Sequence, residues 1–223
     1  MPTTDTTVAE RAKASLGTSA TAIYIAAADA LKREASGKFL HLADVGCGTG
    51  SFRSFCLPLC DHYCGIDVVR YESFPADVDF LAADLDAASW PMEDGLFDAT
   101  VSIETIEHLE NPRAFFRELT RITRPGGLVI VTTPNQLSLL SKLTLVVKNQ
   151  FTAFQERPGL YPAHRTALLA IDLIRISKEC GLENLRIEYS NHGRIPGSAK
   201  GWPSVLRGRA FSDNVLVIAR KSA

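Results

Sequence analysis

The chain has 223 residues, of which 46% are hydrophobic and 22% are charged, and its 24 lysines and arginines nearly balance its 25 acidic residues. This length predicts one generous domain that folds without disulfides or a structural metal. The formal net charge of −1 supplies no general attraction to a polyanion, because non-specific affinity for nucleic acid comes from clustered cations. We therefore do not expect nucleic acid as a partner.

The cysteine content and the hydrophobic segments predict a cytoplasmic location. The five cysteines are odd in number and lack the spacing of a disulfide framework, which favours a reducing compartment. The polar amino-terminal residues contain no apolar core of the length that a signal peptide needs. The longest lipid-like stretch, residues 137–147, is much shorter than the roughly 20 residues of a spanning helix. No transmembrane segment is expected.

Helical and extended patterns alternate along the first part of the chain. A helix is expected at about 18–35, followed by a buried strand at 39–45 that ends in glycines and by a helix that begins near Ser51. Further strands are expected at 63–69, 78–82, 97–103 and 127–133. A helix that begins with Asn111 and Pro112 precedes the last of these and is stopped by Pro125, Gly126 and Gly127. Strands separated by helix-length segments predict a parallel sheet with crossover helices.

The alternation is interrupted after Asn135. Residues 136–164 contain an apolar helix-like stretch, several aromatic residues and several helix breakers, which we interpret as a cap over one end of the sheet. A helix at about 166–180 and strands at 182–189 and 211–219 complete the pattern. The link between the last two strands carries four cationic residues and no acidic residue. We expect a single domain over residues 1–223, with residues 136–164 as its substrate cap.

The most informative segment follows the first strand directly and reads Asp-Val-Gly-Cys-Gly-Thr-Gly from Asp44 to Gly50. Glycines at alternate positions allow a sharp turn and a close approach of the backbone to a ligand. Their spacing is Gly-x-Gly-x-Gly, whereas the dinucleotide-binding fingerprint is Gly-x-Gly-x-x-Gly. The acid before the glycines also disfavours a phosphate ligand. A carboxylate at Asp44 instead suits a ligand that carries an ammonium or sulfonium cation.

Two further acids follow at the ends of the next strands. Asp67 lies about 20 residues after the turn, where a carboxylate accepts both hydroxyl protons of a ribose. Asp84 follows the third strand, where it can accept from the exocyclic amine of an adenine. Each acid by itself is also compatible with an ordinary loop residue. All three lie at carboxyl ends of strands, the edge at which open α/β sheets bind ligands, and this joint placement favours a site.

These segments resemble those of the class I S-adenosylmethionine-dependent methyltransferases. Four further segments share the resemblance: Phe97-Asp98-Ala99, Glu104-Thr105-Ile106-Glu107-His108-Leu109-Glu110-Asn111-Pro112, Arg124-Pro125-Gly126-Gly127 and Thr132-Thr133-Pro134-Asn135. The resemblance covers residues 39–219. It implies an α/β, Rossmann-like, seven-stranded sheet of order 3-2-1-4-5-7-6, with strand 7 antiparallel and helices on both faces. It also implies S-adenosyl-L-methionine as the cofactor and S-adenosyl-L-homocysteine as its product. The expected cofactor-binding residues are Asp44, Gly46, Cys47, Gly48, Gly50, Asp67, Val68, Asp84, Leu85 and Glu104.

The expected catalytic residues are Glu104, His108 and His164. A hydroxyl acceptor benefits from a base, and histidine is the residue whose ordinary pKa lies closest to neutral. Glu104 and His108 follow the fourth strand four residues apart, so they share one face if the segment is helical. His164 precedes the next helix and is a further candidate for a base, a ligand or a substrate contact.

The same segment raises the question of a metal. Glu104, Glu107 and His108, with His164 as a further ligand, suit a divalent cation of the Mg or Mn type more than zinc. The pattern resembles metal-dependent small-RNA 3′-terminal 2′-O-methyltransferases and certain ubiquinone-pathway O-methyltransferases. It also resembles the generic fourth-strand motif of many metal-free members, in which the residues at Glu107 and His108 support the loop and the helix. The prediction assigns no metal ligand and keeps a divalent metal as the alternative.

The expected function is the transfer of a methyl group from S-adenosylmethionine to an oxygen of a small metabolite or sugar. The basic link at residues 191–210 suits an anionic acceptor, such as a carboxylate, a phosphate or a sugar nucleotide. Three alternatives remain: a metal-dependent RNA 2′-O-methyltransferase, a non-catalytic cofactor-binding module of methyltransferase type, and a nicotinamide-binding Rossmann domain. No oligomeric state is predicted.

Overall fold

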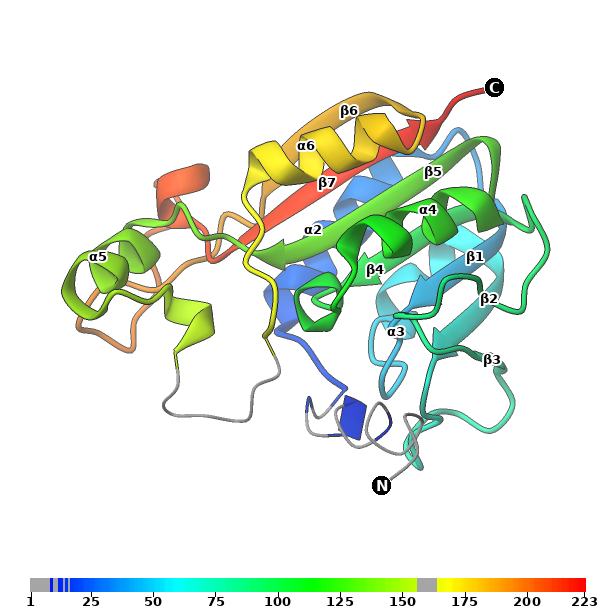
Figure 1. Ribbon diagram of the computed structural model, residues 1–223, viewed down its shortest axis with the longest axis horizontal. Coiled ribbons are helices and arrows are strands. Elements are labelled where there is room, and N and C mark those ends of the chain that lie inside the picture. Colours follow the sequence, from blue (N-terminus) through cyan, green and yellow to red (C-terminus); the bar gives the residue numbers. More distant parts are fainter. Residues whose placement is uncertain (1–8, 10–11, 14, 16, 156–163) are drawn as a thin grey trace.

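Seven strands form one sheet in the computed structural model, which describes residues 9, 12, 13, 15, 17–155 and 164–223. The strand order is β3-β2-β1-β4-β5-β7-β6, which confirms the order implied by the sequence (Figure 1). The pairs among β1 to β5 are parallel, whereas β7 is antiparallel to both of its neighbours. The strands are β1 (Phe39–Val45), β2 (Cys60–Asp67), β3 (Asp79–Ala82), β4 (Phe97–Ile103), β5 (Thr123–Pro134), β6 (Leu182–Tyr189) and β7 (Asn214–Lys221).

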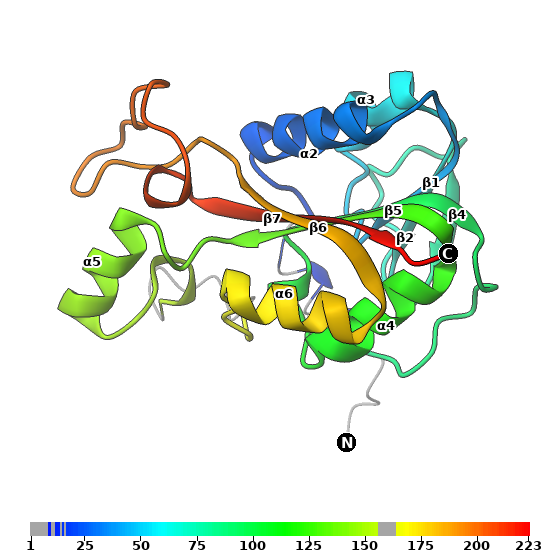
Figure 2. The same cartoon turned by 90° about the horizontal axis from the view of Figure 1, so that it is seen from above.

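Helices cover both faces of this sheet. Helix α2 (Thr21–Glu34) and the short α3 (Arg53–Cys56) lie on one face, and α4 (Pro112–Ile122) and α6 (Ala170–Glu179) lie on the other (Figure 2). Each face therefore has its own apolar core, one around Leu31 and Phe52 and the other around Phe115 and Phe116. Every residue of β4 is buried, as expected for a central parallel strand that is covered on both sides.

Local signals in the sequence determine where several helices begin and end. The Asn111 side chain accepts a hydrogen bond from the Ala114 N–H, and Pro112 occupies the first position of α4, as predicted. Gly181, which has a φ of 76°, follows the last turn of α6. A left-handed glycine is a common way to end a helix, because other residues pay a steric cost there.

Several predicted boundaries differ from the structure. The helix expected at about 166–180 is α6, which begins at Ala170, and the strand expected at 211–219 is β7, which begins at Asn214. β2 begins at Cys60 rather than 63, and the helix expected after Ser51 has only the four residues of α3, followed by the 3₁₀ turn η1 (Leu57–Leu59). β5 begins at Thr123, so the Pro-Gly-Gly segment lies within a strand and not before it. The reason is tertiary: Thr123 pairs with Phe97, and its hydroxyl lies 2.8 Å from that of Thr100 on β4, across an irregularity in the register.

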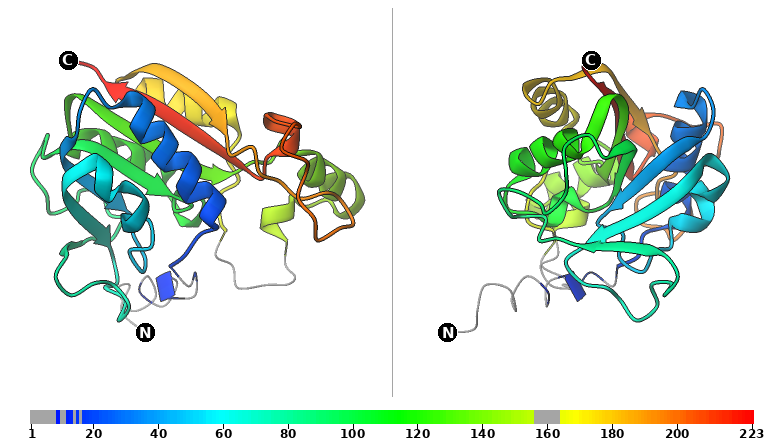
Figure 3. Two further views of the ribbon diagram at one scale, coloured as in Figure 1. Left: turned by 180° about the vertical axis from the view of Figure 1, so that it is seen from behind. Right: turned by 90° about the vertical axis from the view of Figure 1, so that its right-hand side faces the viewer.

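Two segments project beyond the carboxyl end of β5. The first contains α5 (Leu139–Lys148) and the 3₁₀ turn η3 (Thr152–Phe154), and the second is the link between β6 and β7, with the turn η4 (Arg209–Phe211). They lie at the same end of the molecule in Figure 1 and in the left view of Figure 3. Residues 156–163 of the expected cap lie outside the described residues. Among the described helices, none has the length and apolar character needed to cross a membrane.

Candidate active site

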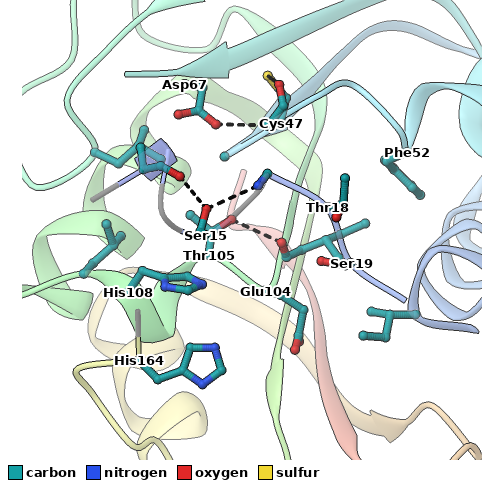
Figure 4. Close-up of a pocket in the computed structure, with 18 of the residues that line it drawn as sticks. Ser15, Thr18, Ser19, Cys47, Phe52, Asp67, Glu104, Thr105, His108 and His164 are labelled. Atoms are coloured by element: carbon teal, nitrogen blue, oxygen red, sulfur yellow. Dashed lines mark hydrogen bonds between the residues drawn. The ribbon is translucent and has the colours of Figure 1, made fainter. Parts of the chain in front are cut away.

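A cavity of about 730 Å³ opens at the carboxyl ends of the parallel strands. Its wall is formed by the glycine turn after β1, the ends of β2 and β4, the 3₁₀ turn η2 (Ile106–His108), η3 and the segment that leads into α2. Asp67 and Cys47 lie on one side of it and His108 and His164 on another (Figure 4). This volume is typical of a site for a small molecule or a cofactor.

The glycine turn is shaped by close contacts with two other segments. Gly46 has a φ of 77°, and a methyl group at its Cα would overlap the Thr105 side chain. Gly48 has a φ of 52°, and a methyl group there would overlap the backbone of Gly17. Both residues line the cavity. Any other residue at either position would be strained by its backbone conformation and would also clash.

Gly50 is the one expected cofactor-binding residue that does not line the cavity. It lies behind the turn, where a methyl group at its Cα would come within 3.0 Å of the Phe74 ring. Its lack of a side chain therefore allows Phe74 to pack beneath the turn. All the other expected cofactor-binding residues line the cavity: Asp44, Gly46, Cys47, Gly48, Asp67, Val68, Asp84, Leu85 and Glu104.

Asp67 joins the glycine turn to the end of β2. One carboxylate oxygen accepts from the Gly48 N–H at 2.9 Å, and the other accepts from the Val68 N–H at 2.7 Å. Burial raises the pKa of this carboxyl, and the backbone donors oppose the rise because they stabilise the charged form. A carboxylate has about four acceptor positions, so Asp67 retains capacity for hydroxyl groups of a ligand.

Asp44 is buried at the end of β1 and is 2% exposed. Its carboxylate accepts a hydrogen bond from the Tyr63 hydroxyl at 2.6 Å. Burial raises its pKa to about 7, the Tyr63 bond opposes the rise, and the nearby Asp67 carboxylate adds to it. A cation in the cavity would therefore stabilise the ionised form. Tyr63 was not identified from the sequence. Its position does carry a signal: Asp44 pairs with Gly65 on β2, and Tyr63 lies two residues before Gly65, so Tyr63 and Asp44 lie on the same face of the sheet.

Asp84 and Leu85 follow β3 and border the cavity next to Asp67. Asp84 accepts from the Asp86 N–H at 3.0 Å, which orders the turn that begins there. The Asp86 carboxylate in turn accepts from the Glu110 N–H at 2.7 Å. These contacts connect the loop after β3 to the loop after η2, so Leu85 is a fixed apolar part of the wall.

The helical face that Glu104 and His108 would share does not form, because only the 3₁₀ turn η2 is present there, although both residues line the cavity. Glu104 precedes η2 and has a left-handed backbone with a φ of 51°. Its two carboxylate oxygens accept from the Thr132 hydroxyl at 3.0 Å and from the Asn214 amide at 2.8 Å. The side chain is thereby directed toward β5 and β7. Burial raises its pKa to about 7, and these two hydrogen bonds oppose the rise.

Glu107, His108 and His164 form a compact group in the same wall. One ligand atom of each lies within 4.8 Å of the others. The imidazole rings of His108 and His164 meet edge to face, with 4.8 Å between their centroids. Glu107 is fully buried, and its Oε1 lies 3.9 Å from His164 Nε2 without a hydrogen-bond partner among the described residues. Burial raises the pKa of Glu107 well above its ordinary value.

Tertiary contacts hold His164 in this group, although it is remote in sequence. Its Nδ1 lies 2.7 Å from the Ala153 carbonyl oxygen, and because a carbonyl only accepts, Nδ1 carries the proton. The following N–H groups of Arg165 and Thr166 donate to the Glu107 carbonyl at 2.7 and 3.0 Å. Burial lowers the pKa of His164, which favours the neutral ring. Its Nε2 is therefore an acceptor, able to take a proton or to coordinate a cation.

Comparisons with known proteins agree with this architecture. Residues 43–131 match a family model described as a methyltransferase domain. The chain is 30% identical over 115 residues to a ubiquinone biosynthesis O-methyltransferase of Maricaulis maris, with 48% of this chain and 45% of the relative covered. It is 32% identical over 108 residues to a chloroplastic tocopherol O-methyltransferase of Arabidopsis thaliana, with 43% and 30% covered. The chain thus spans less than half the length of these two relatives.

Solved structures share the fold at lower identity. A putative methyltransferase from Bacillus halodurans superposes with a TM-score of 0.61 at 18% identity, covering 89% of this chain and 100% of the other. An N-methyltransferase from Bradyrhizobium japonicum, in complex with S-adenosyl-L-homocysteine, superposes with a TM-score of 0.57 at 17% identity, covering 89% and 86%. Residues 43–131 are thus similar to a methyltransferase domain, and the sheet of the whole chain has the same fold as these solved structures.

Proposed function

We propose that this chain transfers the methyl group of S-adenosylmethionine to an oxygen atom of a small molecule. One observation carries the proposal: a single cavity joins the glycine turn and its acids to a pair of imidazoles. The two relatives described above are O-methyltransferases by name, which supports oxygen as the acceptor atom. The cytoplasmic location and a single domain that includes residues 136–164 as its acceptor cap are parts of the same proposal.

Each part of the cofactor has a candidate partner in the wall. Asp44 offers a buried negative charge to the amino group or the sulfonium, and Gly46 and Gly48 line the cavity beside it. Asp67 offers acceptors to the ribose hydroxyls. Asp84 and Leu85 offer an acceptor and an apolar surface to the adenine. Cys47, Val68 and Glu104 complete the proposed cofactor contacts.

The chemistry required of the protein is mainly alignment and removal of one proton. The bound cofactor supplies a methyl group on a positively charged sulfur, which is intrinsically ready for transfer. The protein orients an acceptor hydroxyl and takes its proton, and alignment of this kind accounts for much of the rate enhancement of bound reactants. His108 is our candidate for the base, and His164 supports it through the edge-to-face ring contact.

A second candidate mechanism rests on a specific observation. Glu107, His108 and His164 offer one oxygen and two nitrogens in a compact group, and Glu107 Oε1 has no hydrogen-bond partner among the described residues. A divalent cation would occupy such a group and neutralise the buried carboxylate. In that case the imidazoles would hold the metal, and the acceptor hydroxyl would lose its proton more easily beside it.

Calorimetry with the EDTA-treated protein tests the cofactor assignment. We expect micromolar binding of S-adenosylmethionine and S-adenosylhomocysteine and no binding of NADH. Asp67→Ala should weaken the binding of both by about 1.5–3 kcal/mol, because hydrogen bonds to a charged group are lost. Asp79→Ala, which removes an exposed carboxylate outside the cavity wall, should bind like the unaltered protein. Unchanged affinity in Asp67→Ala would reject the ribose assignment.

Asp44→Asn should stabilise the ligand-free protein while it weakens cofactor binding. The carboxyl titrates near pH 3.8 when unfolded and near 7 when folded, so the folded state holds its proton more tightly. The stability of the unaltered protein therefore falls as the pH rises from about 4 to about 7, and the advantage of the variant should grow over that interval and then level off. Urea unfolding of both proteins at several pH values measures this difference in the free energy of unfolding. A constant difference across this range would contradict the buried-carboxylate account.

His108→Ala should lower turnover by about 10²–10⁴-fold, the usual contribution of a general base. The affinity for S-adenosylmethionine should stay within about threefold, because the ring contributes to proton transfer rather than to cofactor binding. Radiolabelled methyl transfer to an acceptor found by screening phenols and hydroxy acids provides the measurement. His62→Ala, on the exposed part of β2, serves as the control. Equal turnover in both variants would leave His108 with a structural role only.

Metal titration separates the two mechanisms. If the imidazoles act as bases, methyl transfer should survive removal of metals with EDTA. If they hold a metal, the EDTA-treated protein should bind Mn²⁺ in calorimetry, and Glu107→Gln should abolish that binding because the amide carries no charge. Loss of activity in EDTA that Mn²⁺ restores would replace the base mechanism with the metal mechanism.

A further inference from the structure

Helix α5 packs against the protein through its polar side. Ser141 is the only buried residue of the helix. Its hydroxyl accepts from the Thr152 N–H at 3.3 Å, and the Thr152 hydroxyl lies 3.0 Å from that of Thr144. Ser141 and Thr144 lie on the same side of the helix, and both face η3. Hydroxyl-bearing residues thus supply hydrogen bonds that attach α5 to η3, and the Lys148 ammonium adds one to the Gln155 side chain at 2.8 Å.

The opposite side of α5 is apolar and faces outward. Leu139, Leu143, Val146 and Val147 follow the spacing of one helical stripe, and they are 40%, 50%, 79% and 70% exposed. A surface helix of a globular protein normally turns such a stripe toward the core. In α5 the arrangement is reversed, and a contiguous apolar surface of this kind marks an interaction site. We call these four residues the α5 stripe.

The two described segments at this end of the molecule carry cationic residues and no acidic residue. Residues 134–155 and 190–212 contain six of the 24 lysines and arginines of the chain and none of its 25 acids. All six side chains are exposed: Lys142, Lys148, Arg194, Lys200, Arg207 and Arg209. Within the described part of the chain, Arg194 alone among them forms an ion pair, with Asp213 at 2.9 Å. Val205, on the same link, is 82% exposed.

These two segments lie together at one end of the molecule, past the carboxyl end of β5 (Figures 1 and 2). We propose that this end docks onto the surface of an anionic lipid bilayer. The α5 stripe would lie in the interface between headgroups and acyl chains, and the cations would contact lipid phosphates. Interfacial helices combine an apolar face with lysines and arginines beside it in this way, and a helix of 10 residues is too short to span.

Charge favours a bilayer over a second copy of this chain. A two-fold interface places the same surface of both copies face to face, so the unpaired cations of one copy would meet those of the other. An anionic bilayer neutralises the same cations, at about 1 kcal/mol for each one near the surface. The rest of the molecule carries the acidic excess, since the net charge of the whole chain is −1. Positive charge is therefore concentrated at this end of the molecule, and negative charge is in excess over the rest.

The docking surface adjoins the cavity. Helix α5 is followed, after residues 149–151, by η3, whose three residues line the cavity. Arg194 of the link lines it as well. A docked molecule would thus hold its cavity wall beside the lipid surface, which favours an amphiphilic acceptor with an apolar part. This consequence for the acceptor rests on the proposed function, whereas the docking surface itself does not.

Sedimentation with lipid vesicles tests the docking. The full chain is mixed with vesicles of phosphatidylcholine alone or with about 30% phosphatidylglycerol, at about 0.1 M and about 1 M NaCl. We expect binding to the anionic vesicles at low salt, weaker binding at high salt and little binding to phosphatidylcholine alone. Lys200→Gln with Arg207→Gln should lower the partition coefficient by about fivefold for each charge removed.

The stripe is tested by Val146→Ser with Val147→Ser, which should lower partitioning at least about tenfold, because buried apolar area contributes to interfacial binding. Both side chains are exposed, so the fold should tolerate the change, as the circular dichroism spectrum can verify. The matched control is Leu57→Ser with Leu96→Ser. These residues are 40% and 42% exposed and precede β2 and β4 at the opposite end of the sheet, so partitioning should not change.

Three outcomes would overturn the docking proposal: no binding to either vesicle, equal binding with and without anionic lipid, or self-association in sedimentation velocity that the serine variants abolish while vesicle binding is absent. The cofactor titration is independent of all three. Vesicle binding without cofactor binding would remove the proposed function and leave the docking surface, and the reverse result would remove only the docking surface.

Discussion

The hydrogen bond from the Gly48 N–H to the Asp67 carboxylate joins the loops that follow β1 and β2, and the whole cavity wall is arranged around it. Gly48 approaches Gly17 on one side, and Gly46 approaches Thr105 on the other. Three loops and the segment before α2 thereby meet within a few ångströms. Glycine is required at these positions because side chains would separate the loops, and the ligand surface is the backbone that this close packing leaves exposed.

The same edge of the sheet holds several buried carboxyl groups whose ionisation does not stabilise the fold. Asp44, Glu104 and Glu107 are carboxyl groups whose pKa values burial raises, so ionising them costs free energy in the ligand-free protein. Tyr63, Thr132 and Asn214 offset only part of this cost. Destabilising groups of this kind cluster at functional sites, where a bound cation or proton compensates for them. The burial of these acids is therefore an argument for a ligand that is independent of any sequence motif.

The two ends of the molecule differ in how they are stabilised. The parallel strands and α4 are held by apolar cores on both faces, with β4 fully buried. Of the segments past β5, α5 is held to η3 through hydroxyl groups, whereas the β6–β7 link is held by the Trp202–Phe211 ring contact and the Arg194–Asp213 ion pair. Both segments leave valines exposed: Val146, Val147 and Val205. A rigid sheet edge thus supports the glycine turn, while loops with few apolar contacts form the other wall. Binding loops carried by a rigid scaffold are the usual arrangement in α/β proteins.

Much of this could be predicted from the sequence, because the relevant signals are local. Strands β1, β4 and β6 match their predicted ranges. The first two are largely apolar runs, whereas β6 alternates apolar and polar residues after Gly181. The position of Asp44, Asp67 and Asp84 at one edge also followed from order along the chain, because parallel strands bring their carboxyl ends together. The asparagine before α4 likewise acts within its own turn.

Side-chain directions, by contrast, were decided by the tertiary structure. Spacing predicts one shared face for Glu104 and His108 only if the segment is helical, but it forms just the turn η2. Hydrogen bonds from Thr132 and Asn214, which lie on strands distant in sequence, instead fix the Glu104 carboxylate. His164 joins Glu107 and His108 only because the Ala153 carbonyl and the Glu107 backbone hold its segment there. Gly50 belongs to the motif, yet it lies behind the turn against Phe74. Periodicity specifies which face of an element is buried, whereas the orientation of a polar side chain depends on partners that only the folded chain brings near.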